Sequence, residues 1–150
     1  MKHSFKLARN LPTFQRTTTG NRKLRATKKV KYVIWNLPAV VTCPGRTEQC
    51  EKLCYARKAE KAYPQVMPFR LHNLQETMRA GWRWRMIWTL HQYMQRPAYA
   101  AAEKIVVRVH EAGDYYGLQY CRDWLYVMKY AARRWPNMVF VSYTKSFDIV

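Results

Sequence analysis

The sequence predicts an α/β protein built on a short parallel sheet. Three runs rich in β-branched and aromatic residues have the composition of buried strands: Val30 to Trp35, Ile105 to Val109 and Met138 to Tyr143. Stretches with helical spacing of apolar residues separate them, in the order strand, helix, helix, strand, helix, strand. Strands that alternate with helices in this way pair in parallel through right-handed crossovers, so we expect a parallel sheet with flanking helices.

The first helix is expected to follow a loop. Residues 36–45 contain two prolines and a glycine, which indicates irregular structure. Thr47 is a suitable N-cap for a helix that carries two cysteines and runs to about residue 62. Pro64 and Pro68 are expected to break this helix.

A long helix is expected next, from about residue 69 to residue 95. Gly81 is expected to distort it locally, and Pro97 to follow its end. Three tryptophans in this stretch have spacings that favour a packing face of the helix over a platform for stacking nucleic-acid bases: Trp82, Trp84 and Trp88.

The remaining elements follow the second strand. Residues 110–117 contain two glycines and several polar side chains and are predicted to form a loop. An amphipathic helix is expected over residues 118–135, ended by Pro136 and Asn137. The third strand begins at Met138, directly after this stop signal.

Length and composition favour one domain and exclude several classes of protein. The chain has 150 residues, of which 49% are hydrophobic and 15% aromatic, so it can form a packed core. No apolar run approaches the ~18 residues of a membrane span. No apolar segment follows the basic N-terminus, as it would in a secretory signal. We therefore expect a cytoplasmic protein that does not interact with membranes.

The positive charge is concentrated near the N-terminus. The formal net charge is +18, and residues 1–42 contain 10 of the 27 Lys and Arg residues but no acidic residue. We predict a basic arm over residues 1–28, followed by a single α/β domain over residues 29–150. Such an arm attracts phosphates through counterion release, which makes nucleic acid its expected partner. The alternative is a solvated tail without a specific partner.

Polar and sulfur-containing side chains follow all three predicted strands. Three cysteines follow the first strand, residues 110–114 follow the second, and Thr144 to Ser146 follow the third. Functional groups of parallel α/β sheets collect beyond the carboxyl ends of the strands. The sequence therefore predicts a functional site at this end of the sheet.

The cysteines have a spacing that indicates metal binding. Cys50 and Cys54 are four residues apart, so on one helix their sulfurs would share a face. Cys43 precedes them in the loop, where Pro44 and Gly45 can turn it towards that face.

Three thiolates suit a [4Fe-4S] cluster with one open iron. A closed zinc site would need a fourth ligand, for which Cys121 or His110 is available. The third interpretation is that the cysteines are ordinary free thiols.

The other two loops contain candidate ligands for a small molecule. His110, Glu111 and Asp114 could bind an amine, a metal or a proton in transit, and Gly113 permits a tight turn beside them. A polar turn with a hydrogen-bonded histidine is the alternative interpretation. Lys145 could bind a carboxylate or a phosphate, or it could be a solvated side chain.

Several of these segments resemble a known family when they are taken together and in order. They are Gly20 to Leu24, Asn36 to Ala39, Thr42 to Gly45, Cys50 to Ala56, Arg108 to Tyr116 and Phe140 to Ser146. They resemble the bacteriophage "gene product eighty-eight" family and cover most of residues 20–146.

That family is similar to radical S-adenosylmethionine enzymes, which hold a [4Fe-4S] cluster in a three-cysteine loop after the first strand of a barrel. The resemblance implies that Cys43, Cys50 and Cys54 hold such a cluster. It implies that Gly113 and Asp114 contribute to an S-adenosylmethionine site, and any chemistry would be reductive cleavage of that cofactor. A zinc-stabilised, non-enzymatic nucleic-acid-binding module is the alternative function.

The resemblance also implies a partial (β/α) barrel. A complete eight-unit barrel takes ~250 residues, whereas this chain has about three βα units. Residues 138–143 would then lie at an open sheet edge. We therefore expect a relative truncated at its C-terminus, or a chain whose sheet is completed by a partner chain or by dimerisation.

Overall fold

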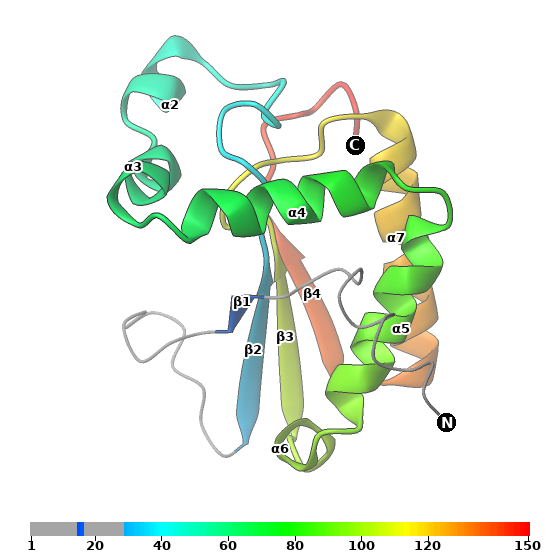
Figure 1. Cartoon of the computed structure of the whole chain (residues 1–150). Coiled ribbons are helices and arrows are strands. Elements are labelled where there is room, and N and C mark those ends of the chain that lie inside the picture. Colours follow the sequence, from blue (N-terminus) through cyan, green and yellow to red (C-terminus); the bar gives the residue numbers. More distant parts are fainter. Residues whose placement is uncertain (1–14, 17–28) are drawn as a thin grey trace.

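The computed structural model describes residues 15–16 and 29–150. Its centre is an open sheet in which three parallel strands lie side by side in chain order: β2 (Val30–Trp35), β3 (Lys104–Val109) and β4 (Met138–Ser142). The predicted fold class and strand order are confirmed (Figure 1). A two-residue strand, β1 (Gln15–Arg16), pairs antiparallel with the outer edge of β2. The rest of the predicted basic arm lies outside the described residues.

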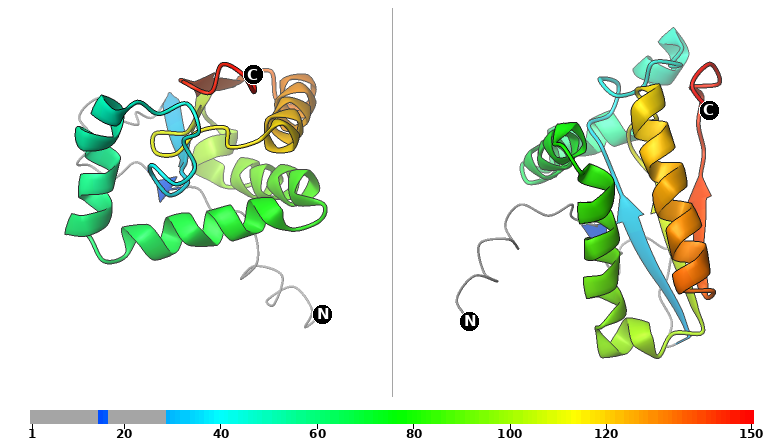
Figure 2. Two further views of the ribbon diagram at one scale, coloured as in Figure 1. Left: turned by 90° about the horizontal axis from the view of Figure 1, so that it is seen from above. Right: turned by 90° about the vertical axis from the view of Figure 1, so that its right-hand side faces the viewer.

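The core lies between one face of the sheet and two helices, α5 (Trp82–Met94) and α7 (Leu118–Arg134). Register pairs Val33 with Val107 and Val107 with Phe140, so these side chains share a face. They pack with Trp82 of α5 and Trp124 of α7 in one hydrophobic cluster. The two helices run side by side along the sheet (Figures 1 and 2).

The first predicted helix is two helices in the structure. Thr47 is the N-cap of α2 (Glu48–Lys52), as the sequence predicts, and its hydroxyl accepts a hydrogen bond from the backbone N–H of Cys50 at 3.1 Å. The helix ends at Leu53, and Cys54 is the N-cap of α3 (Tyr55–Ala62). The prediction that Cys50 and Cys54 share one helix is therefore wrong.

The predicted long helix is also two helices, α4 (Val66–Met78) and α5. Gly81 separates them with φ of 70°, a left-handed conformation that glycine adopts without steric cost. Pro68 does not exclude helix, because it lies in the first turn of α4, where backbone N–H groups have no helical partner. Figure 1 shows α4 lying across the carboxyl ends of the strands, whereas α5 follows the sheet.

The tryptophans of α5 divide between two environments. Trp82 is buried in the core, whereas Trp84 and Trp88 are half exposed on the outer side of the helix. A packing face is therefore the correct prediction for Trp82 alone. A short helix that the pattern does not predict, α6 (Pro97–Ala100), connects α5 to β3.

The sheet remains open at β4. This strand is the last in the sheet, and on its less buried face Val139 and Val141 are each more than one third exposed. A partner chain at this edge stays a prediction. Within the described part of the chain, no helix combines the length and the apolar character needed to cross a bilayer.

Candidate functional site

The loops that follow the three parallel strands meet at the carboxyl end of the sheet. They enclose a cavity of about 280 Å³. Its lining includes Cys43, Cys50 and Cys54 from the first connection, residues 111–114 from the second, and Tyr143, Thr144 and Lys145 from the third. The left panel of Figure 2, which is viewed from above, shows these segments arranged around the ends of the strands. The predicted location of the site therefore coincides with a cavity.

The cysteine-containing connection is held by its own hydrogen bonds. The backbone N–H of Cys43 donates to the carbonyl of Val40 at 3.1 Å, and the carbonyl of Cys43 accepts from the backbone and the guanidinium of Arg46, each at 3.2 Å. Glu51 of α2 pairs with Arg46 at 3.0 Å and with Arg57 of α3 at 3.1 Å. These ion pairs connect the loop, α2 and α3 across the break at Leu53.

The thiols are half-buried, and that of Cys43 lies among negative groups. Burial is the main cause that raises the pKa of Cys43, and the charges of Asp114, Cys54 and Cys50 raise it further. A cation bound in the cavity would favour the thiolate, because it would offset each of these causes. Across residues 15–16 and 29–150, no three His, Cys, Asp or Glu side chains meet around the position of a single metal ion.

Asp114 joins the three loops. Its carboxylate accepts hydrogen bonds from the backbone N–H of Lys145 at 2.9 Å and of Tyr115 at 2.7 Å. Its own N–H donates to the carbonyl of Thr42 at 3.1 Å. The residue is 5% exposed, although it contributes to the cavity wall. The geometry therefore gives Asp114 a positioning role between the cysteine loop and the segment around Lys145.

Two glycines allow the loops to approach closely. A Cβ at Gly45 would lie 1.9 Å from the carbonyl oxygen of Lys145, so only glycine fits beside the third loop. Gly113 has φ of 81°, and a Cβ there would lie 2.6 Å from Oγ1 of Thr42 and 2.7 Å from Cβ of Leu37. Both glycines are therefore required by close packing around the cavity.

His110 is directed into the core. Its Nε2 lies 2.8 Å from the hydroxyl of Tyr120, which also accepts a hydrogen bond from the indole of Trp35 at 2.8 Å. Its backbone has φ of 64°, and the residue is not part of the cavity wall. Of the four residues predicted to bind a cofactor, Gly113, Asp114 and Lys145 line the cavity and His110 does not.

Burial lowers the pKa of His110 to about 3, although the charge of Asp114 raises it. The unfolded chain, with a pKa near 6.5, binds a proton that the folded protein excludes, so this group destabilises the fold as pH falls below 6.5. We expect the free energy of unfolding to fall by about 2 kcal/mol between pH 7 and pH 5 from this residue alone. Urea titrations of the protein and of His110→Asn would measure it, and equal pH dependence of the two would contradict it.

The sequence pattern does not predict the buried polar residues that hold the first loop. Glu60 of α3 and Arg70 of α4 form an ion pair at 2.7 Å, and Glu60 also accepts the N–H of Ala39 at 2.7 Å. Asn36 accepts the N–H of Ala112 at 2.8 Å. The only sequence signal is the polar amide of Asn36 immediately after a buried strand.

Tyr55 makes a further contact between the first two connections. It follows Cys54, and its hydroxyl donates to the carbonyl of Glu111. Together with Asn36 and Glu60, this contact fixes the cysteine segment relative to the loop after β3.

Comparison with known proteins gives one match. A family model described as Gene product 88 matches residues 12–150. No curated protein and no solved structure matches the chain. The matched range includes the three cysteines and every segment that lines the cavity.

Proposed function

This chain belongs to the Gene product 88 family, and we propose that it is a metalloprotein whose Cys43, Cys50 and Cys54 hold a [4Fe-4S] cluster. The observation that carries this proposal is the shared cavity, which is lined by all three thiols and by the loops after the two neighbouring strands. Three thiolates leave one iron of such a cluster without a protein ligand, and the neighbouring loops provide groups for a small molecule there.

A zinc ion and a [4Fe-4S] cluster require different spacings of the three sulfurs. Thiolates on one tetrahedral zinc lie about 3.8 Å apart, since each Zn–S bond is about 2.3 Å. In a cluster each cysteine binds its own iron, so the sulfurs are further apart. The presence of all three thiols in the lining of one cavity is compatible with the cluster.

The fourth ligands required by the zinc alternative are poorly placed. Cys121 is buried on α7 within the hydrophobic core cluster, and His110 contacts Tyr120 there. Neither residue lines the cavity. A closed zinc site would therefore need a rearrangement of the core, which disfavours a zinc-stabilised module.

The proposed chemistry is that of a radical S-adenosylmethionine enzyme. When reduced, a cluster of this kind supplies the electron for reductive cleavage of S-adenosylmethionine. Lys145 would bind the carboxylate of that molecule, since an ammonium group pairs with carboxylates. The absence of a side chain at Gly113 lets the second loop pack against Thr42 and Leu37 of the cysteine loop, and Asp114 holds the backbone N–H of Lys145 in place.

Anaerobic reconstitution with iron and sulfide tests the metal centre. The protein is expected to bind about four irons per chain and to gain broad visible absorbance. The triple variant Cys43→Ser, Cys50→Ser, Cys54→Ser should lose both signals, whereas the matched control Cys121→Ala should retain them. One tightly bound zinc that is lost in Cys121→Ala would refute the proposal.

Consumption of S-adenosylmethionine by the reconstituted, chemically reduced protein tests the reaction separately. Loss of consumption in Lys145→Gln with the iron content unchanged would support the assigned role of Lys145. An iron-loaded protein that consumes no cofactor would limit the function to cluster binding.

A further inference from the structure

Helices α5 and α7 present an exposed surface that combines aromatic rings with cations. This surface does not line the cavity that contains the cysteines. We call this surface the α5–α7 face, and its members are Arg83, Trp84, Trp88, Tyr126, Lys129, Tyr130, Arg133 and Arg134. From it we propose a binding site for single-stranded nucleic acid, independent of the metal centre.

The aromatic rings of this face remain accessible although the core is close. Trp84 is 50% exposed, Trp88 53% and Tyr126 38%. The rings of Trp84 and Tyr126 lie 5.2 Å apart in an edge-to-face arrangement, so one helix positions the ring of the other. The guanidinium of Arg83 lies 4.7 Å from the Tyr126 ring and 5.5 Å from the Trp84 ring. These rings are fixed in place and still offer surface for stacking.

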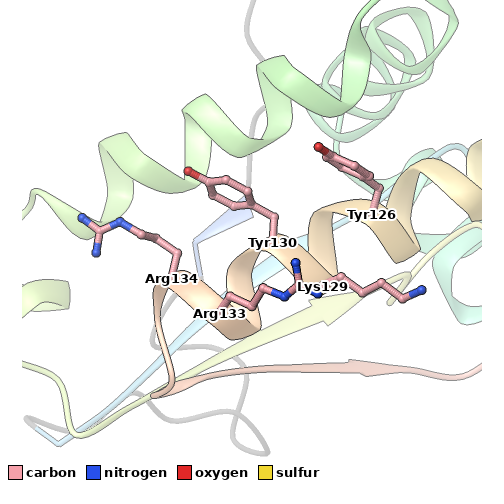
Figure 3. A pocket seen from close by; sticks show the side chains of 5 residues that line it. All are labelled: Tyr126, Lys129, Tyr130, Arg133 and Arg134. Carbon is pink, nitrogen blue, oxygen red and sulfur yellow. The ribbon is translucent and has the colours of Figure 1, made fainter.

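Cations border the rings along α7. Tyr126, Tyr130 and the basic side chains Lys129, Arg133 and Arg134 line a surface groove of about 360 Å³. Figure 3 shows the two tyrosines pointing towards the neighbouring helix, while Lys129 and Arg133 extend along the other side of α7. Rings and charges therefore form two adjacent rows along the helix.

The face carries a strong excess of positive charge. Four of its eight members are Lys or Arg, and the one acidic residue in the sequences of α5 and α7 is Asp123. The carboxylate of Asp123 forms an ion pair with Arg83 at 3.8 Å and accepts a hydrogen bond from the side-chain amide of Gln119 at 3.1 Å. Neither Lys129 nor Arg133 forms an ion pair with any residue that the structure describes. Their charges are therefore available to an anionic partner.

Single-stranded nucleic acid can bind both the row of rings and the row of cations. Its phosphates pair with Lys and Arg, and its unpaired bases have flat faces that stack on tryptophan and tyrosine. Trp84 and Trp88 are one helical turn apart, about 6 Å along the axis, so they can meet successive bases of one strand. A duplex hides its base faces, so it would contact the cations of this face but would not stack on its rings.

Charge removal tests the phosphate contacts. Binding of a fluorescent oligothymidylate to the full chain should weaken about tenfold in Lys129→Gln, Arg133→Gln, and the salt dependence of log K should become shallower by about 1.4 for two lost contacts. The matched control Lys58→Gln, Lys61→Gln removes two exposed charges from α3 and should change the slope by less than half as much. Equal effects of the two pairs would refute the site.

Ring removal tests stacking. Trp88→Ala should weaken oligonucleotide binding by about fivefold or more, as expected for one lost base stack. Tyr63→Ala removes an equally exposed ring outside the face and should leave binding unchanged. Retained affinity in Trp88→Ala would overturn the proposal. So would equal competition by duplex DNA, or binding of phosphatidylserine vesicles with the same variant dependence in place of the oligonucleotide.

Oligonucleotide binding should persist in the triple cysteine variant, because the α5–α7 face lies outside the cavity. A folded triple variant that no longer binds the oligonucleotide would refute the claim of independence. This measurement therefore distinguishes a failure of the nucleic-acid proposal from a failure of the metal-centre proposal.

Discussion

Replacing Arg70 with methionine is expected to lower the free energy of unfolding by about 3–5 kcal/mol, as is typical when one partner of a buried ion pair is removed. The Arg70 and Glu60 side chains are 6% and 4% exposed, and their atoms approach to 2.7 Å. Among the residues that the structure describes, the variant leaves the buried Glu60 carboxylate with the N–H of Ala39 as its one hydrogen-bond partner. Urea denaturation at pH 7 measures the change.

Two further variants identify the cause of that loss. Adding Glu60→Gln to Arg70→Met removes the uncompensated charge while keeping an acceptor for Ala39, so the double variant should recover at least half of the lost stability. Lys52→Met breaks the exposed pair between Lys52 and Glu48 on α2 and should cost less than about 0.5 kcal/mol. A small effect of Arg70→Met would contradict the assigned role of the buried pair.

The position of the Glu60–Arg70 pair matters because it supports the cysteine segment. Glu60 holds Ala39, which lines the same cavity as Cys43. Arg70 also donates to the carbonyl of Ala56 at 3.0 Å, near the start of α3. One ion pair therefore connects α4, α3 and the loop after β2, and its loss should reduce iron binding together with stability.

The strand order and the place of the cavity could be predicted because their signals are local. A strand such as Val30–Trp35 can be identified by its β-branched and aromatic residues. Parallel pairing then brings the loops that follow the strands to one end of the sheet. The cap at Thr47 is local as well, since a threonine before an acidic first turn is a known helix start.

The division between α2 and α3 could not be predicted from the pattern. Neither glycine nor proline stands at Leu53 and Cys54, and the residues on both sides favour helix. The break is supported by contacts that no local sequence pattern predicts. Tyr55 contacts Glu111, and Arg57 forms an ion pair with Glu51. Tertiary structure therefore overrides the local preference at the cysteines.

The roles of polar residues were the least predictable part of the site. Asp114 is a candidate ligand by its position after a strand, but its carboxylate accepts two backbone N–H groups, one of them 31 residues away. His110 follows the same strand and turns into the core, because its left-handed backbone directs the side chain to Tyr120. Sequence position shows the loop in which a residue lies, whereas the hydrogen bonds decide its role.

Gly113→Ala is expected to destabilise the protein by about 2–5 kcal/mol, from two separate causes. The left-handed φ of 81° costs an alanine roughly 1–2 kcal/mol. The added Cβ would also lie 2.7 Å from Cβ of Leu37, and such overlap in a packed loop costs about 1–3 kcal/mol more. Thermal and urea unfolding measure the total.

Gly81 provides a matched control that separates the two causes. It has a similar φ of 70°, but a Cβ there would have no atom within 4 Å. Gly81→Ala should therefore show the backbone cost alone, and the excess in Gly113→Ala should be the packing cost. Because that overlap falls on Leu37 and Thr42, next to Cys43, only Gly113→Ala should also lower iron binding. Equal losses in the two variants would mean that the loops after β2 and β3 can separate without cost.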